Sequence, residues 1–445
     1  MLADTTTEPL SVYVHVPWCV RKCPYCDFAT KPGTPETIPH QAFGQSLATE
    51  LDLRWPEGHG LASVYFGGGT PSLWDPAELG AFVRRLDERR PATRAGSSAR
   101  EHALRASTAP NASARRELEV TVECNPSELT LCLALKLRDA GATRLSIGVQ
   151  SFSDKALGFL GRRHSAAQAE AGVNAARGAG LRISTDHIYG LPGESVEDAL
   201  ATTKRLLELG TNHVSAYALT IERDTRFGEL ARQGRLPTID EGVVADTYLA
   251  IEAALDAAGF THYEVSNYGR GADRADHNSR VWRQESYLGL GPGAVGTLYT
   301  PGWAHAAAVP PNNTSGRPTT SADGADAIGP HVVEPSQHRA DAPSDVPPPA
   351  HRWRNDGSVT GYLSALGARR LPSADTESMT HADIGLEALI LGLRTREGAA
   401  IAHLTPELRH RAHRLHAAGR LEQTPTHYRV PRQAWLHLDA FLRAL

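Results

Sequence analysis

Three of the five cysteines in the chain lie close together, in the stretch HVPWCVRKCPYCDFAT. They are Cys19, Cys23 and Cys26, spaced as Cys-x3-Cys-x2-Cys. Soft thiolates select zinc, copper(I) or an iron–sulfur cluster. Structural zinc normally takes four ligands in two pairs, and Cys124 and Cys132 stand on a later unit, too far along the chain to be expected near the cluster. A four-iron cluster on three thiolates leaves one iron open, so the spacing favours a reactive [4Fe-4S] cluster.

The cysteines follow a strand-like run, and five more such runs come later. The runs cover residues 11–17, 63–69, 118–126, 144–152, 182–192 and 213–220. The stretches between them, such as 126–141 and 195–210, have helical spacing and a closing glycine. Six β-α units in series predict an α/β fold with a parallel sheet, open or closed into part of a (β/α)6 barrel.

Glycine and polar residues stand at the C-terminal ends of these runs, where the chemistry of such barrels gathers. The second run ends in FGGGTPS, in which Gly68, Gly69 and Thr70 are expected to let a ligand approach the backbone and its N–H groups. Glu123 ends the third run, where it can accept hydrogen bonds from a ribose or an ammonium group. The later candidates are Gln150, Arg162 and Asp186. The alternatives are a plain strand-to-helix turn for the glycine loop and a chance solvated strand-end carboxylate for Glu123.

The cysteine motif resembles that of the radical S-adenosylmethionine (SAM) enzymes. The resemblance implies that the amino and carboxylate groups of SAM chelate the open iron, and that one electron cleaves the sulfonium to a 5′-deoxyadenosyl radical. It also implies that the Gly68–Thr70 loop meets the SAM amino group and that Gln150, Arg162 and Asp186 contact SAM. Arg162 would pair with the SAM carboxylate, with Arg163 beside it as the alternative.

Two tyrosines lie near the cysteines, Tyr13 on the first strand and Tyr25 inside the motif. Within the same resemblance, both would pack on the cluster or on the adenine. The alternatives are ordinary core packing for Tyr13 and an aromatic loop residue for Tyr25.

A larger set of motifs narrows the resemblance to one group. YVHVPWCVRKCPYCDF, GGGTPS, RLSIGVQSF, IYGLPGES, YLGLGPGA and LILGLRTREG are similar to those of the oxygen-independent coproporphyrinogen III oxidases and their relatives, the HemW haem chaperones. The oxidases carry a further cysteine where this chain has Phe28, and an N-terminal arm ahead of the first strand. Both features favour the chaperone, with oxidase activity or another radical SAM reaction as the alternatives.

The stretch HNSRVW, residues 277–282, resembles the His-Asn-x-x-Tyr-Trp motif associated with haem in the chaperones. It makes His277 the expected axial ligand of a bound haem, with Trp282 beside it, although Val281 stands where the motif has tyrosine. The alternative for His277 is a solvated or capping loop histidine. The resemblance further implies an acceptor protein, not identified, to which the haem is delivered.

The resemblance implies a radical SAM core over residues 1–300, and the helical pattern from residue 352 predicts a small, mainly helical, HemN-like C-terminal domain over 352–445. Residues 94–116 and 301–351 contain few large apolar side chains and are expected to be a disordered insertion and a low-complexity linker. With 46 basic and 50 acidic residues, the formal charge of −4 does not favour nucleic acid or an anionic membrane. The first ten residues lack the pattern of a signal peptide, so a cytoplasmic location is expected, with any membrane association made through the acceptor.

Overall fold

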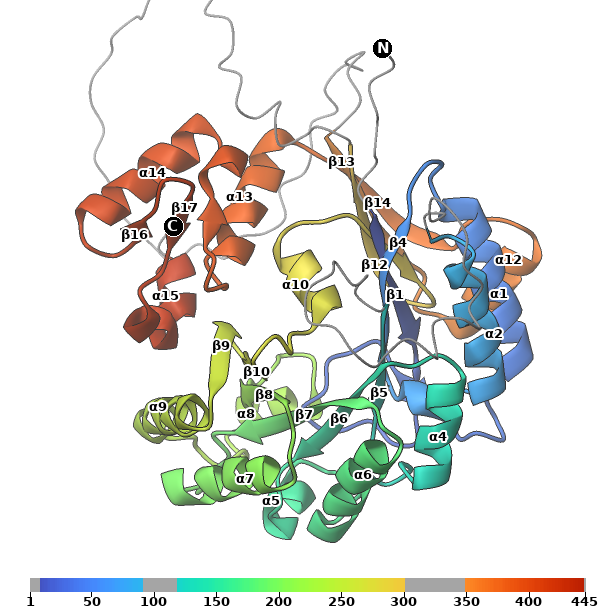
Figure 1. Cartoon of the computed structure of the whole chain (residues 1–445), viewed down its shortest axis with the longest axis horizontal. Coiled ribbons are helices and arrows are strands. Elements are labelled where there is room, and N and C mark those ends of the chain that lie inside the picture. The colour runs from blue at the N-terminus through green and yellow to red at the C-terminus, as the bar shows by residue number, and fades with distance from the viewer. Residues whose placement is uncertain (1–8, 91–117, 301–348, 444–445) are drawn as a thin grey trace, which may run out of the picture.

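One large curved sheet organises the chain in a computed structural model that describes residues 9–90, 118–300 and 349–443 (Figure 1). The predicted insertion at 94–116 and residues 301–348 of the predicted linker lie outside the described residues. The sheet has twelve strands in the order β14-β13-β12-β11-β1-β4-β5-β6-β7-β8-β10-β9.

The centre of this sheet is parallel and contains the six predicted strands. They are β1 (Leu10–Val16), β4 (Leu61–Gly68), β5 (Glu119–Cys124), β6 (Arg144–Gln150), β7 (Arg182–Tyr189) and β8 (His213–Ala218). β11 (Tyr287–Leu290) pairs in parallel with the other side of β1. Antiparallel strands extend both ends: β10 (Asn267–Arg270) and β9 (Phe260–Glu264) beyond β8, and β12 (Val295–Tyr299), β13 (Ala350–Asn355) and β14 (Ser373–Met379) beyond β11. The sheet does not close, so the predicted partial (β/α)6 barrel is confirmed.

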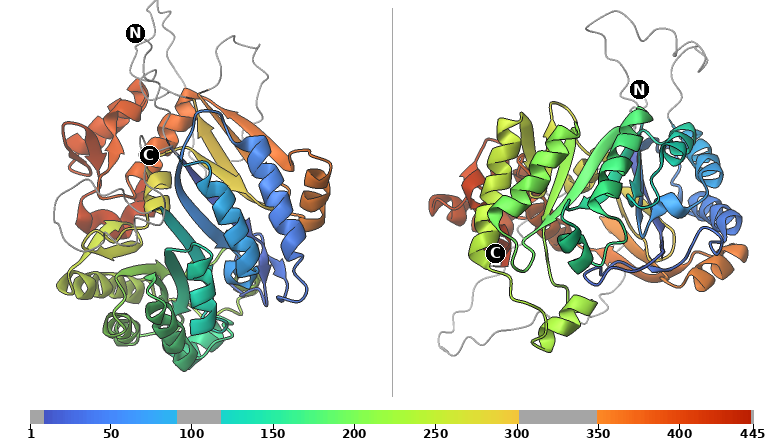
Figure 2. Two further views of the ribbon diagram at one scale, coloured as in Figure 1. Left: turned by 45° about the vertical axis from the view of Figure 1, so that its right-hand side comes forward. Right: turned by 90° about the horizontal axis from the view of Figure 1, so that it is seen from below.

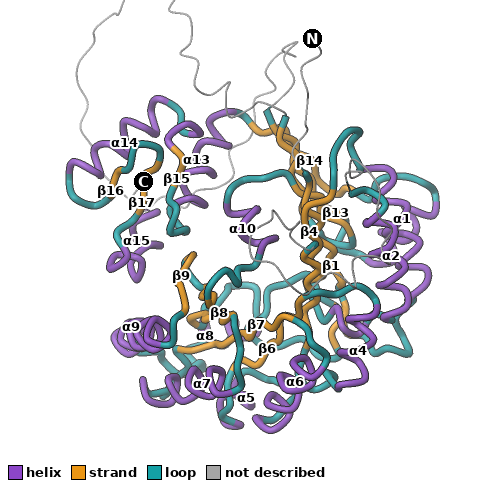
Figure 3. Tube along the Cα trace, in the orientation of Figure 1, coloured by secondary structure: helices purple, strands orange, loops and turns teal. Residues whose placement is uncertain are grey.

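Helices cover the outer side of the parallel strands (Figure 2), and the strands collect in the interior (Figure 3). The connections contain α1 (His40–Arg54), η1 (Pro71–Leu73), α2 (Pro76–Asp87), α4 (Leu131–Asp139), α5 (Asp154–Phe159), α6 (Ala166–Gly178), α7 (Val196–Glu208), α8 (Arg226–Arg232), α9 (Glu241–Ala257) and α10 (Asp276–Trp282). In α7, Ser195 and Asp198 form the reciprocal capping box that fixes where the helix begins. The α7 side chains Ala199, Thr202, Thr203 and Leu206 are buried, as its helical spacing predicted.

The sheet continues after residue 349, since β13 and β14 pair with it and are joined by α12 (Val359–Gly367). A separate group of elements then follows (Figure 1). It consists of α13 (His381–Gly392), β15 (Ala399–Ala400), η2 (Ile401–His403), α14 (Pro406–Ala417), β16 (Glu422–Gln423), β17 (His427–Arg429), η3 (Arg432–His437) and α15 (Leu438–Arg443). This C-terminal part consists mainly of helices and contains a three-stranded sheet. The domain boundary at residue 352 stays a prediction, because the large sheet runs across it.

A buried carboxylate joins the first helix to the late strands. Glu50 of α1 is fully buried and accepts hydrogen bonds from Arg54 Nε (2.8 Å), Asn355 Nδ2 (2.7 Å), the Tyr362 hydroxyl (2.7 Å) and the Gly291 backbone N–H (3.0 Å). Each lone-pair position of the carboxylate therefore has a donor, as a buried charge requires. The contact fixes α1 against β13 and α12.

None of the helices in the described parts of the chain is both long and apolar enough to cross a membrane.

Candidate cluster and cofactor site

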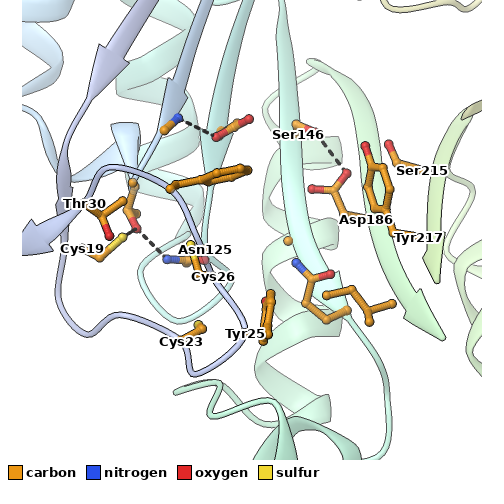
Figure 4. Close-up of a pocket in the computed structure, with 18 of the residues that line it drawn as sticks. Cys19, Cys23, Tyr25, Cys26, Thr30, Asn125, Ser146, Asp186, Ser215 and Tyr217 are labelled. Carbon is orange, nitrogen blue, oxygen red and sulfur yellow. Dashed lines mark hydrogen bonds between the residues drawn. The ribbon is translucent and has the colours of Figure 1, made fainter. Parts of the chain in front are cut away.

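A cavity of about 420 Å³ opens at the C-terminal ends of the parallel strands, beneath the cysteine loop (Figure 4). The loop leaves β1, and β2 (Trp18–Cys19) pairs there with β3 (Lys31–Pro32). Eleven of the residues predicted from the sequence line this cavity: Cys19, Cys23, Tyr25, Cys26, Gly68, Gly69, Thr70, Glu123, Gln150, Arg162 and Asp186. The parallel topology brings them together, because each stands at or just after the end of a strand.

A chain of hydrogen bonds connects two of the cysteines across the cavity wall. Thr70 Oγ1 donates to Cys19 Sγ (3.6 Å) and accepts from Asn125 Nδ2 (2.8 Å). Arg162 donates to Asn125 Oδ1 (2.6 Å) and to Cys23 Sγ (3.7 Å). Burial raises the pKa of the Cys19 thiol, and the hydrogen bond from Thr70 opposes this rise.

The structure distinguishes the two neighbouring arginines. Arg162 lines the cavity and donates to the Tyr25 hydroxyl (3.5 Å) and the Gly148 carbonyl (3.0 Å). Arg163 is exposed and pairs with Glu128 (3.4 Å) outside this cavity. Arg162 is therefore the arginine in position to meet an anionic ligand in the cavity.

Two carboxylates lie deeper in the cavity. Glu123 accepts from the Tyr65 hydroxyl (2.8 Å) and the Gly68 N–H (3.2 Å), and burial raises the pKa of Glu123 to about 7. Asp186 accepts from Ser146 Oγ (3.3 Å), and burial raises its pKa as well. Burial favours the neutral form of both groups, and a cationic ligand placed beside them would favour the ionised form.

Gln150 has an unusual backbone conformation at the end of β6. Its φ is +64°, which is rare outside glycine, and its buried Oε1 has no hydrogen-bond partner among the residues that the structure describes. Backbone strain of this kind is found where a side chain is held for a ligand. Gly148, two residues earlier, lies close to two of these side chains: a Cβ there would lie 2.8 Å from Gln150 Nε2 and 3.0 Å from an Arg162 guanidinium nitrogen, so either side chain would have to shift.

The glycine loop differs from the expectation in one respect. The N–H groups of Gly68, Gly69 and Thr70 donate to Glu123, to the Val16 carbonyl (2.8 Å) and to the Trp18 carbonyl (2.7 Å), respectively. The expectation that these N–H groups face a ligand is wrong, because they are used to join the loop to the cysteine strand. The backbone of this loop can offer a ligand only carbonyl oxygens, which suit an ammonium group.

Cys124 also departs from the expectation, because it lines the same cavity as the cysteine motif. It ends β5, is buried, and donates to the Val122 carbonyl (3.7 Å). Burial raises its pKa to about 12, so it stays a neutral thiol. Cys132 is exposed on α4.

The three motif cysteines line one cavity. Within residues 9–90, 118–300 and 349–443, no group of three Cys, His, Asp or Glu side chains is placed to hold a single metal ion. A four-iron cluster is a larger group, and its thiolates bind different irons. The assignment of Cys19, Cys23 and Cys26 to a [4Fe-4S] cluster stays a prediction.

Comparison with known proteins identifies the family. The model of the Radical SAM superfamily matches residues 13–206. The heme chaperone HemW of Escherichia coli is 35% identical over 296 residues, which are 66% of this chain and 71% of that protein. The heme chaperone HemW of Mycobacterium tuberculosis is 30% identical over 448 residues, covering 100% of this chain and 96% of the relative. The chain belongs to the HemW family.

A solved structure agrees with the fold of this HemW-family chain. Coproporphyrinogen III oxidase (HemN) from Escherichia coli superimposes with a TM-score of 0.68 over 99% of this chain and 91% of that chain, at 18% sequence identity. At that identity the likeness concerns the fold alone.

Phe28, the residue that separates the two predicted activities, lies at the mouth of the cavity. Its side chain is 55% exposed, and its carbonyl accepts from Lys22 Nζ (2.9 Å). A cysteine at this place would add a fourth thiol to the rim. In this HemW-family chain the rim is apolar there.

The two residues of the haem motif, His277 and Trp282, lie at opposite ends of α10 and in different surroundings. His277 is buried, with its Nδ1 3.2 Å from Ser63 Oγ and its ring 5.2 Å from that of Tyr65, and burial lowers its pKa to about 4. The His277 imidazole is therefore closed to solvent in this structure, and its role as haem ligand stays a prediction. Trp282, at the other end of α10, lines a second cavity. Tyr13 lies outside the lining of the cluster cavity and stacks on Tyr65 at 6.2 Å.

Several residues of the cavity were not expected from the sequence. They are Tyr65, Asn125, Arg144, Ser146, Ser215, Tyr217, Asn267 and Asn278. Asn125 could have been found, because it follows Glu123 in VECNP at the end of a predicted strand. Most of the others lie inside strands, where only the register decides which side chains face the cavity.

Proposed function

We propose that the chain is a haem chaperone that binds haem, holds a SAM-coordinated [4Fe-4S] cluster and transfers the haem to an acceptor protein. The observation that carries the proposal is the single cavity that unites Cys19, Cys23 and Cys26 with Arg162 and Glu123. Membership in a family whose relatives are named heme chaperones supports the haem part.

The residues present fit the two cofactors. Cys19, Cys23 and Cys26 would hold the cluster, which supplies an open iron and one-electron chemistry when bound. Arg162 would take the carboxylate of SAM, and the carbonyl oxygens of the glycine loop its ammonium group. Glu123 and Asp186 supply negative charge deeper in the cavity for the rest of the ligand.

Oxidation of coproporphyrinogen III is the competing activity, since the cofactor cavity would serve both. Phe28 argues against it, because no thiol stands at that place on the rim. Composition supports a cytoplasmic location, with membrane contact through the acceptor.

Anaerobic reconstitution with iron and sulfide tests the proposal directly. We expect a cluster absorption band that SAM perturbs, a Soret band on addition of haemin at roughly one haem per chain, and no vinyl porphyrin from coproporphyrinogen III with SAM and dithionite. Retention of the cluster band in a C19A/C23A/C26A variant would contradict the cluster assignment. Vinyl porphyrin above an enzyme-free control would establish the oxidase instead.

A further inference from the structure

The twelve-stranded sheet ends in two edge strands that have different surroundings. At one end, β9 is largely buried, and the segment after α13 covers its outer edge: Glu264 forms an antiparallel bridge with Thr395, and the Arg396 N–H donates to the Tyr263 carbonyl (3.0 Å). At the other end, β14 pairs with β13 and with no other strand in the described parts of the chain (Figure 1). The C-terminal part therefore covers one edge of the sheet and not the other.

The edge strand β14 presents unpaired backbone groups to solvent. Its residues 374–378 are all exposed, and among the described residues none of them forms a backbone hydrogen bond outside the ladder with β13. Along an antiparallel strand, alternate residues bond to one neighbour, so the N–H and C=O groups of the others point to the outer side. An exposed edge of this length without proline is a template for a further strand.

Two carboxylates of β14 lie on the same face of the sheet. Asp375 and Glu377 are two residues apart, so both side chains point to one face. Opposite them on β13 stand Arg354 and Arg352, and Arg352 pairs with Glu387 (2.7 Å). Within the described residues, neither Asp375 nor Glu377 forms an ion pair or a side-chain hydrogen bond. Both carboxylates can therefore bind a cation that approaches from the outer side.

A second copy of this chain would be a poor partner for this edge. In an antiparallel pair of two β14 strands, a centre at Asp375 or at Glu377 places two identical carboxylates opposite each other, and a centre at Thr376 places Asp375 opposite Glu377. Like charges directly opposite destabilise a strand pair. The acidic side chains therefore oppose self-association, and the edge suits a strand of the opposite charge.

We propose that the outer edge of β14 is a docking site for a partner protein that contributes an extended segment with Lys or Arg at every second position. The segment pairs with β14 through backbone hydrogen bonds, and its basic side chains lie opposite Asp375 and Glu377. Leu371, 43% exposed just before the strand, adds an apolar contact at one end. The site is separate from the proposed function, because no residue of β14 lines either cavity.

Binding of a labelled synthetic peptide to the full-length chain tests the charge requirement. The probe is a peptide in which lysine alternates with threonine and valine, compared with the same peptide carrying glutamate in place of lysine. Since opposite charges stabilise cross-strand pairs and like charges destabilise them, we expect the lysine peptide to bind at least about fivefold more tightly by fluorescence anisotropy.

Two variants with the same change in net charge form a matched pair. Asp375→Lys/Glu377→Lys should reverse the preference between the peptides, and both positions are exposed, so the fold should be kept. Glu57→Lys/Asp224→Lys changes two exposed positions elsewhere and should keep the wild-type preference. Hydrogen exchange measured by mass spectrometry then tests whether binding is strand pairing, since the lysine peptide should slow the exchange of amides within residues 374–378.

Each other outcome would overturn the proposal. These outcomes are no binding of the lysine peptide, an unchanged preference in Asp375→Lys/Glu377→Lys, and binding without protection of residues 374–378. Protection of these amides before any peptide is added would show that the edge is already covered. Sedimentation would then assign the cover to a second copy if it finds a dimer, and to the chain itself if it finds a monomer.

Discussion

At the scale of the residue, the two adjacent arginines after α5 give a matched test of the cofactor cavity. Arg162→Ala removes the guanidinium that lines the cavity, whereas Arg163→Ala removes one that pairs with Glu128 outside it. Because a hydrogen-bonded charge contributes about 1.5–3 kcal/mol, we expect Arg162→Ala to weaken SAM binding roughly tenfold or more. Calorimetric titration of SAM into the reconstituted protein measures this.

The control for that experiment is the iron content, which should be equal in both variants. Equal weakening of SAM binding by Arg162→Ala and Arg163→Ala would contradict the assignment of the cavity arginine.

Glu123 makes SAM binding depend on pH. Since its pKa is about 7 in the folded protein, the carboxyl group is protonated below pH 7 and ionised above it. A cationic ligand prefers the ionised form, so SAM affinity should rise between pH 6 and pH 8 and then level off. Glu123→Gln should bind more weakly at pH 8 and show a flat profile. A wild-type affinity that does not change over this range would rule out Glu123 as a contact.

The contribution of Glu123 to the free energy of unfolding falls as the pH rises, whereas its contribution to SAM binding increases. Its folded-state pKa lies above the ordinary value of 4.5, so the native state binds more protons than the unfolded state between about pH 4.5 and 7. Without SAM, ionisation of Glu123 therefore lowers the free energy of unfolding as the pH rises through that window.

Residue types and spacing were enough to predict much of this site. The cysteine triad and the strand-end residues are recognisable because each follows an apolar run directly. Tyr65, Ser146 and Ser215 are not recognisable, because their side chains reach the cavity only through the register of paired strands. Cys124 was expected far from the cysteine motif for a related reason. Separation along the sequence does not show which strand ends lie side by side in the sheet.

At the scale of the element, a substitution of Glu50 tests how much its buried carboxylate contributes to the packing of α1 against β13 and α12. Glu50→Ala leaves donors from Arg54, Asn355 and Tyr362 without an acceptor, and loss of one partner of a buried charge costs about 3–5 kcal/mol. We expect a decrease of this size in the free energy of urea unfolding. Glu57→Ala, at an exposed position shortly after α1, should change it by less than about 0.5 kcal/mol.

The six strands, α7 and the C-terminal helices could be predicted because their periodicity and caps are local. The role of Glu50 could not, since its partners Asn355 and Tyr362 follow it by 305 and 312 residues. The pairing of β13 and β14 with the large sheet could not be predicted either, because it also joins parts of the chain far apart in the sequence. The predicted boundary at residue 352 therefore falls within the sheet.

At the scale of the whole molecule, α10 contacts both cavities. Asn278 lines the cluster cavity and Trp282 lines the second one, within the same short helix. Because the expected haem ligand His277 stands on this helix too, we expect SAM binding to change the haem affinity by about fivefold or more. Linkage requires haem to change the SAM affinity by the same factor. In Asn278→Ala, the factor by which SAM changes the haem affinity, and the factor by which haem changes the SAM affinity, should both approach one. Equal haem affinities of the wild type with and without SAM would exclude the coupling.

The position of β1 in the sheet determines how late in synthesis the large sheet can be fully assembled. This first strand lies between β4 and β11. One of its edges therefore stays unpaired until β11 (Tyr287–Leu290) has left the ribosome. Until then six parallel strands can assemble, but the nascent chain presents an open, apolar strand edge, the kind of surface that pairs with other chains. Glu50, likewise, has no complete set of donors until Tyr362 is made. Newly made chains should therefore depend on protection from aggregation until most of the sequence has been translated.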